Sequence, residues 1–117
     1  MSTGIVNPLI VQIEVTADAT GGVDYVLSRG GWIQSVVVLC TATNAGGTAQ
    51  LLRSTGGPFV AVSAALTCDT ANEIGRAASL AVAQVDCAAG DTLRIVTNGA
   101  ADRCVAHISI QPPNSGA

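Results

Sequence analysis

Hydrophobic and polar residues alternate along this chain in short runs separated by Gly-rich segments. The alternation is clearest at 9–16 and 23–28, where every second residue is apolar. A period of two is typical of a half-buried β-strand, and Gly-rich segments between such runs are typical of turns. The pattern predicts about eight short strands, at 9–16, 23–28, 32–41, 48–53, 59–63, 79–85, 92–97 and 104–111.

Eight short strands at roughly twelve-residue spacing, with no long helix, indicate an all-β fold. We therefore expect an antiparallel β-sandwich with a jelly-roll-like arrangement. The predicted organisation is an extended N-terminal arm at 1–8, a single sandwich domain at 9–113 and a flexible tail at 114–117. Within the domain, Asp69 or Thr70 could cap one helical turn that places Glu73 and Arg76 on one side.

The predicted strand at 32–41 is apolar on both of its faces. Val36, Val38 and Cys40 lie on one face, and Val37 and Leu39 lie on the other. Such a strand is either central and covered twice, or its outer face contacts another subunit. With 49% hydrophobic residues in a short chain, this pattern favours a homo-oligomer, a dimer or a trimer.

Composition argues against an enzyme. The chain has one His, no Lys and only 11% charged residues, whereas catalysis near neutral pH usually depends on His, Lys, paired carboxylates or an activated Cys. His107 lies on a predicted strand face without a second His, so we expect a surface or interface imidazole. The glycine pairs fit no phosphate-binding motif. We expect no catalytic residues and no cofactor.

Charge and hydropathy limit the partners. A net charge of −3, with five dispersed Arg, argues against nucleic acid, which requires clustered positive charge. The uncharged stretch 30–52 contains too many Gly, Gln, Ser and Asn residues to span a bilayer. The first residues lack the pattern of a secretory signal. We therefore expect a soluble protein with no membrane partner.

The four cysteines, Cys40, Cys68, Cys87 and Cys104, form no C-x-x-C pair. Cys40 and Cys104 fall inside apolar strands, where a free thiol behaves as a small hydrophobic side chain. We predict reduced, structural thiols and no metal site, because a single His supplies metal ligation poorly. Cys68 and Cys87 flank turns and are the pair to suspect first if a disulfide forms.

Four residues are candidates for contact with a partner. Ile5 and Val6 are the apolar residues of the N-terminal arm, and a free terminus can add a strand to a neighbour. Asp102 and Arg103 follow a turn of small residues at the start of the last strand. Arg103 either makes a bidentate contact across a subunit boundary or is a solvated residue that contributes little.

The C-terminal half resembles the small capsid decoration (cement) proteins of tailed bacteriophages. The resemblance rests on 66–78, with its Thr67-Cys68-Asp69-Thr70-Ala71 and Arg76-Ala77-Ala78, on the turn 88–93 and on the segment 97–103. It implies a compact β fold that binds the outside of the phage head as a small homo-oligomer. The implied partner is the major capsid protein, and the implied location is the outer surface of the virion after synthesis in the bacterial cytoplasm.

A non-catalytic carbohydrate-binding or receptor-binding sandwich is the alternative. Sugar-binding faces generally use exposed aromatic rings, and this chain offers only Trp32, Tyr25 and Phe59. Tyr25 and Phe59 are expected to face the core. The shortage of aromatic residues also means that any capsid contact would have to use aliphatic area, strand pairing and the arm, because interface hot spots are usually rich in aromatic residues.

Overall fold

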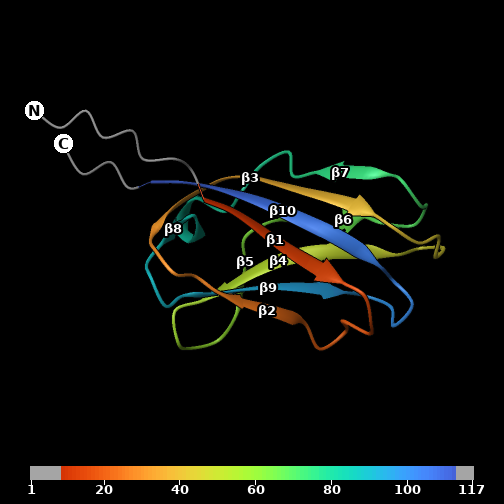
Figure 1. The fold of residues 1–117 in the computed structure, drawn as a ribbon, viewed down its shortest axis with the longest axis horizontal. Coiled ribbons are helices and arrows are strands. Elements are labelled where there is room, and N and C mark those ends of the chain that lie inside the picture. The colour runs from red at the N-terminus through yellow and green to blue at the C-terminus, as the bar shows by residue number, and fades with distance from the viewer. Residues whose placement is uncertain (1–8, 113–117) are drawn as a thin grey trace, which may run out of the picture.

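The structure is a computed structural model that describes residues 9–112, and it consists of two antiparallel β-sheets packed face to face (Figure 1). Sheet A contains β1 (Leu9–Val15), β3 (Gly31–Cys40), β7 (Ile74–Arg76), β8 (Asp86–Cys87) and β10 (Cys104–Gln111). Sheet B contains β2 (Val23–Val26), β4 (Thr48–Ser54), β5 (Val60–Ala61), β6 (Leu66–Thr67) and β9 (Thr92–Thr97). A short 3₁₀ helix, η1 (Val82–Gln84), precedes β8.

The order of the strands is that of a jelly roll. Sheet A runs β1-β10-β3-β7, with β8 also paired to β3, and sheet B runs β2-β9-β4-β5, with β6 also paired to β4. The pair β5 and β6 follows one edge of β4, and the pair β7 and β8 follows one edge of β3. If β5 and β6 are counted as one interrupted strand, and β7 and β8 as another, the chain has eight strands. Renumbered 1 to 8 in chain order, they read 1-8-3-6 in sheet A and 2-7-4-5 in sheet B. This arrangement confirms the predicted jelly-roll-like sandwich.

The core lies between the two sheets and is almost entirely aliphatic. Every second residue of β1, β9 and β10 points inward, as their alternating burial shows. In β3 the alternation is interrupted once, between Ile33 and Val36, where its register with β10 shifts. The largest fully buried side chains are Leu27, Ile33, Leu51, Leu93, Ile95, Ile108, Ile110, Val11, Val15, Val36, Val38 and Val62. Within the described residues no aromatic ring is fully buried, and Tyr25 packs at the margin of the core.

The segment between β6 and β8 differs from the prediction. The expected helical turn after Asp69 is instead a tight turn, in which Glu73 N donates to Thr70 O at 3.1 Å and Asn72 adopts a φ of 71°. The expected strand at 79–85 is also wrong, because that segment bends and then forms η1. Its alanines have low β-propensity and offer little side chain to pack on a sheet.

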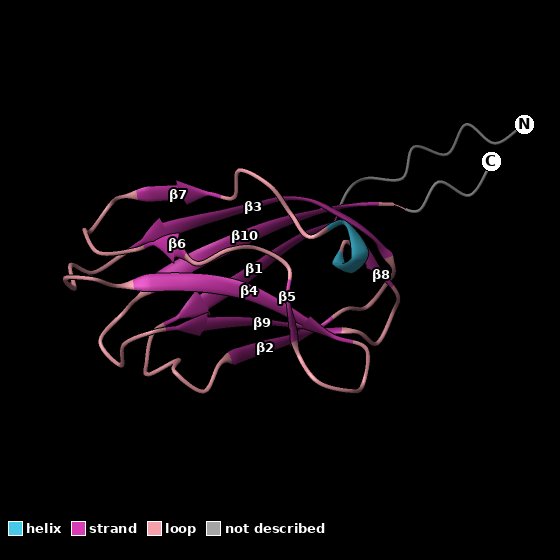
Figure 2. Cartoon of the chain, turned by 180° about the vertical axis from the view of Figure 1, so that it is seen from behind, coloured by secondary structure: helices cyan, strands magenta, loops and turns pink. Residues whose placement is uncertain are grey.

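The strands β4, β9 and β2 of sheet B lie side by side (Figure 2). Their outer face carries an ion pair that lies over an aromatic ring. Arg94 of β9 donates from Nε and Nη2 to the carboxylate of Asp24 on β2, at 2.6 and 3.0 Å. This hydrogen bonding lowers the pKa of Asp24. The guanidinium also lies 3.8 Å from the ring centroid of Phe59, so the expectation that Phe59 faces the core is wrong. Phe59 instead contacts β9 from outside, where a cation–π contact helps to hold its loop.

A second ion pair is buried at one end of the sandwich. Arg53 of β4 donates from Nε and Nη2 to Oδ2 of Asp91, at 3.2 and 3.1 Å, and only 11% and 9% of the two side chains are exposed. Ala88 N donates to the same oxygen at 2.9 Å, and Arg53 also donates to Gln84 O at 3.0 Å. The pair therefore joins β4 to the chain on both sides of β8 and closes this end.

These two ion pairs allow a matched prediction about stability. Asp91→Asn removes the charge that compensates a buried guanidinium, so we expect the free energy of unfolding to fall by about 3 kcal/mol. Asp24→Asn removes an exposed partner and should cost less than about 1 kcal/mol. Urea denaturation followed by circular dichroism measures both. Equal losses in the two variants would contradict a structural role for Asp91.

Candidate interaction surface

No other described element lies over the outer face of sheet A (Figure 1). This face carries exposed and half-buried apolar side chains. Register places alternate residues of β1, β10, β3 and β7 beside one another on this face. Two adjacent rows form the surface that we call the A face: Glu14, Val105, Leu39 and Ile74 in one row, and Gln12, His107, Val37 and Arg76 in the next.

The exposure of the A face shows whether β3, the strand that is apolar on both faces, is covered on both of them within this chain. β3 is central in sheet A, yet Val37 and Leu39 remain only half-buried, and Ile74 beside Leu39 is 55% exposed. Toward the other end of the sheet, Ile10 is 54% and Trp32 39% exposed. Within residues 9–112, β3 is therefore covered on one face alone, and its outer face is partly exposed.

Asp102 and Arg103 lie at the end of the sandwich where the loops after β3 and β9 meet. Asp102 is fully buried, and its carboxylate accepts hydrogen bonds from Gly99 N at 3.0 Å and from the side-chain amide of Asn44. Arg103 donates from Nη1 to the carbonyls of Ala100 and Asp102, at 2.7 and 2.8 Å. Asp102 therefore holds two loops together, and Arg103 is the half-buried member that remains at the surface.

The close approach of these loops requires a glycine. A Cβ at Gly47 would collide with the carboxylate of Asp102 and with the carbonyl of Cys68. The Gly-rich segment before the strand at 48–53 marks a turn in the sequence, but nothing in the sequence shows that Asn44 of this turn bonds Asp102, 58 residues further along the chain.

The other candidate partner residues, Ile5 and Val6, lie outside the described residues. The structure does show where the arm joins the fold: Leu9 pairs with Ile110, whereas Val15 pairs with Cys104. Arg103 therefore lies at the far end of β1, about 20 Å from Leu9 at the usual rise along a strand.

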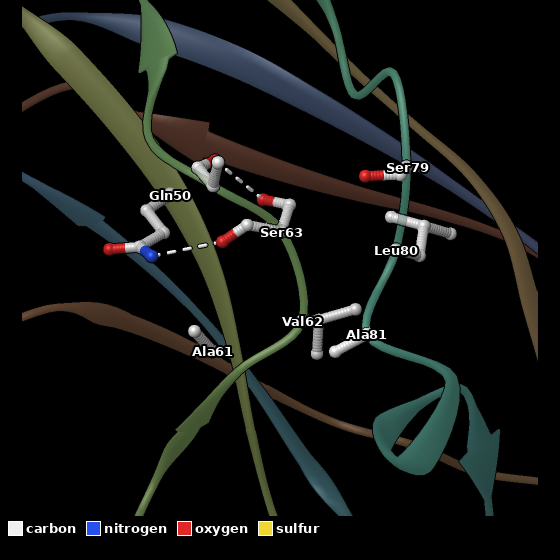
Figure 3. A pocket seen from close by; sticks show the side chains of 8 residues that line it. Gln50, Ala61, Val62, Ser63, Ser79, Leu80 and Ala81 are labelled. Carbon is white, nitrogen blue, oxygen red and sulfur yellow. Dashed lines mark hydrogen bonds between the residues drawn. The ribbon is translucent and has the colours of Figure 1, made fainter.

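A shallow depression of about 360 Å³ lies where the chain after β5 passes the chain before η1 (Figure 3). Two of its polar side chains bond to backbone carbonyls of the lining: Gln50 Nε2 donates to Ser63 O at 2.9 Å, and Ser63 Oγ donates to Ala64 O at 3.0 Å. Ala81 N donates to Val62 O across the gap at 2.8 Å. The remaining lining residues are small or aliphatic, so the depression presents no acid, base or activated nucleophile.

Three of the four cysteines gather beneath the loops that Asp102 holds. Cys40 and Cys104 are direct cross-strand partners, and Cys68 lies against them. Burial raises the pKa of the Cys104 thiol to about 11, and burial together with the adjacent Cys40 raises the pKa of Cys68 further. Cys87 lies elsewhere, near Arg53 and Asp91, and burial raises its pKa as well.

All four thiols are free in the structure, and Cys68 has Cys40 and Cys104 as its neighbours rather than Cys87. Among residues 9–112, no group of three or more His, Cys, Asp or Glu side chains is arranged to hold a metal ion. His107 lies half-buried in the A face, beside Gln12 and Val37. No helix in the described part of the chain has the length and apolar character needed to cross a bilayer.

Comparison of the chain with protein-family models, with curated proteins and with solved structures gives no match.

The role of Asp102 can be tested through stability. Asp102→Ala leaves Gly99 N and the amide of Asn44 without their acceptor inside the protein, so we expect a loss of about 1–3 kcal/mol in the free energy of unfolding. Asp18→Ala is the control, because Asp18 is exposed and bonds only within its own turn, to Thr20. A loss no larger than that of the control would show that the carboxylate does not hold the loops.

The buried thiols predict a stability that falls at high pH. The unfolded chain loses its thiol protons near the ordinary pKa of 9.0, whereas folded Cys104 keeps its proton up to about pH 11. Because the folded-state pKa is the higher one, the stabilisation is complete below pH 9 and is lost as the pH rises through 11. Each such thiol contributes at most about 1.4 kcal/mol per pH unit. Denaturation at pH 8 and 10.5 measures the fall, and Cys104→Ala should reduce it.

Proposed function

We propose that this protein is a structural virion protein, a capsid decoration protein that binds the outside of a phage head as a small homo-oligomer and stabilises it. The observation that carries the proposal is the A face, an uncovered surface with apolar side chains near its centre. The depression beside Ser63 is lined by no titratable side chain. A contact surface without chemistry is what an assembly protein needs.

The jelly-roll architecture is compatible with this role. The same fold serves in viral capsid proteins, lectins and cupins, so function must be argued from the surface of this chain. The inner faces of the two sheets, as far as the structure describes them, carry no His. The carboxylates that are buried, Asp91 and Asp102, are already bonded within the chain. These features favour a binding role over metal-dependent catalysis.

The proposed contacts with the major capsid protein use the two ends of the sandwich. The arm that carries Ile5 and Val6 precedes β1 at one end, and Arg103 lies at the other. The sequence-based resemblance to decoration proteins and the low positive charge, which avoids strong attachment to the genome, both support this assignment.

A carbohydrate-binding module is the second candidate, and Trp32 favours it. This ring is 39% exposed at the start of β3, close to Gln34 and Gln111, which hydrogen-bond to each other. An aromatic ring with amide side chains beside it can stack on a sugar. Tyr25 and Phe59 cannot extend that platform, because Tyr25 packs on the core and Phe59 lies against Arg94.

Co-sedimentation with purified heads of the phage that encodes the chain tests the proposal. We expect saturable binding that is weakened by deletion of residues 1–8, and by about 1–3 kcal/mol in Arg103→Ala if Arg103 meets a carboxylate that becomes buried. Arg94→Ala removes the same charge from sheet B and should bind normally. No binding to heads, combined with saturable binding to a glycan that Trp32→Ala abolishes, would replace the proposal with the second candidate.

A further inference from the structure

We infer that the A face is the self-association surface, and that it binds a second copy of this chain about a two-fold axis parallel to the strands. The inference names the surface for the self-association that is part of the proposed function. The pattern of charge and apolar area on the A face supports it, and self-association of the purified protein is measured without phage heads. Its failure is therefore separate from failure of the proposed function.

The charges lie at opposite edges of the A face. Glu14 is on β1, and Arg76 is on β7, with β10 and β3 between them. The strands that carry Glu14 and Arg76 are three strand spacings apart, about 14 Å, which is too far for an ion pair within one chain. Both side chains are exposed, and neither has an ion-pair partner within the described residues. Between them lie the apolar residues Val105, Leu39 and Val37, together with His107, and all four are half-buried.

A two-fold axis parallel to the strands pairs these opposite charges. If the axis passes between β10 and β3, it sets β1 of one copy opposite β7 of the other at the same height along the strands. Gln12 then faces Arg76 of the second copy, and Glu14 lies one row away on the same edge. An axis perpendicular to the strands would instead set β1 against β1 and β7 against β7, so that like charges would meet.

The available area suits a reversible dimer. Four strands are about 19 Å wide, and β10, with eight residues, is about 27 Å long, so each copy offers a footprint of roughly 500 Å². Two copies together bury about 1,000 Å², the lower limit for a specific interface. Three apolar residues and His107 occupy the middle, and the charges of Glu14 and Arg76 lie at the rim, as in known interfaces. We therefore expect a dimer that dissociates in the micromolar range and is weakened by salt.

Charge reversal tests the two-fold geometry. In Glu14→Arg the dimer would bring two guanidinium groups together at each edge, and in Arg76→Glu it would bring two carboxylates together. Each variant alone should therefore have a dimer dissociation constant at least about tenfold higher. A mixture of the two variants forms heterodimers in which both contacts pair opposite charges. Sedimentation equilibrium of the mixture should recover the wild-type mass of about 23 kDa, twice the 11.6 kDa of one chain.

The Asp24–Arg94 pair on sheet B supplies the control. This pair lies within one chain, so mixing Asp24→Arg with Arg94→Asp should neither remove nor restore the dimer. Leu39→Asp, at the centre of the A face, should give a monomer, whereas Leu52→Asp, half-buried on the outer face of sheet B, should remain a dimer. Circular dichroism confirms that each variant is folded.

Several results would overturn the inference. They are a wild-type monomer at about 100 μM, a trimer, a dimer that survives Leu39→Asp, or a mixture of Glu14→Arg and Arg76→Glu that stays monomeric. A monomer in solution whose head binding is lost in Leu39→Asp would assign the A face to the capsid lattice instead. A monomer that dimerises only after deletion of residues 1–8 would assign the face to the chain's own arm.

Discussion

The fold depends on keeping the space between its two sheets filled with aliphatic side chains and closed to water at both ends. The core has no fully buried aromatic ring within the described residues, so branched aliphatic side chains, alanines and thiols must fill it by close packing. Strands cover the two faces, but the open ends need polar loops. One end is closed by Arg53 and Asp91 and the other by Asp102, and each of these carboxylates receives backbone and side-chain donors.

Most of the strands could be predicted because their side chains alternate in burial. The strands at 92–97 and 104–111 occur at the predicted bounds, since a period of two on a half-buried sheet leaves a clear pattern in the sequence. The segment 64–85 could not be predicted, because alanine and serine carry too little hydrophobic contrast to show which residues face inward. Its path is fixed by partners far away in the chain, such as Val62 for Ala81 and Cys40 for Asn72.

Only part of the candidate surface could be predicted from the sequence. The apolar outer side of β3 was visible as a run without polar residues, but its row of neighbours depends on register. Register brings Val105 beside Leu39 and separates Glu14 from Arg76 by two strands. It also makes Cys40 and Cys104 cross-strand partners, although they are far apart in the chain. Sequence spacing carries no information on such pairings until the strand order is known.

The pairing of Leu9 with Ile110 has a practical consequence for the molecule as a building block. The first and last strands lie side by side in sheet A, so the described chain enters and leaves the fold at the same end. The loops held by Asp102 are at the opposite end. A peptide or enzyme joined directly before β1 or after β10 would therefore lie at one end of the sandwich, and the loops at the other end would stay free for engineering of a second specificity.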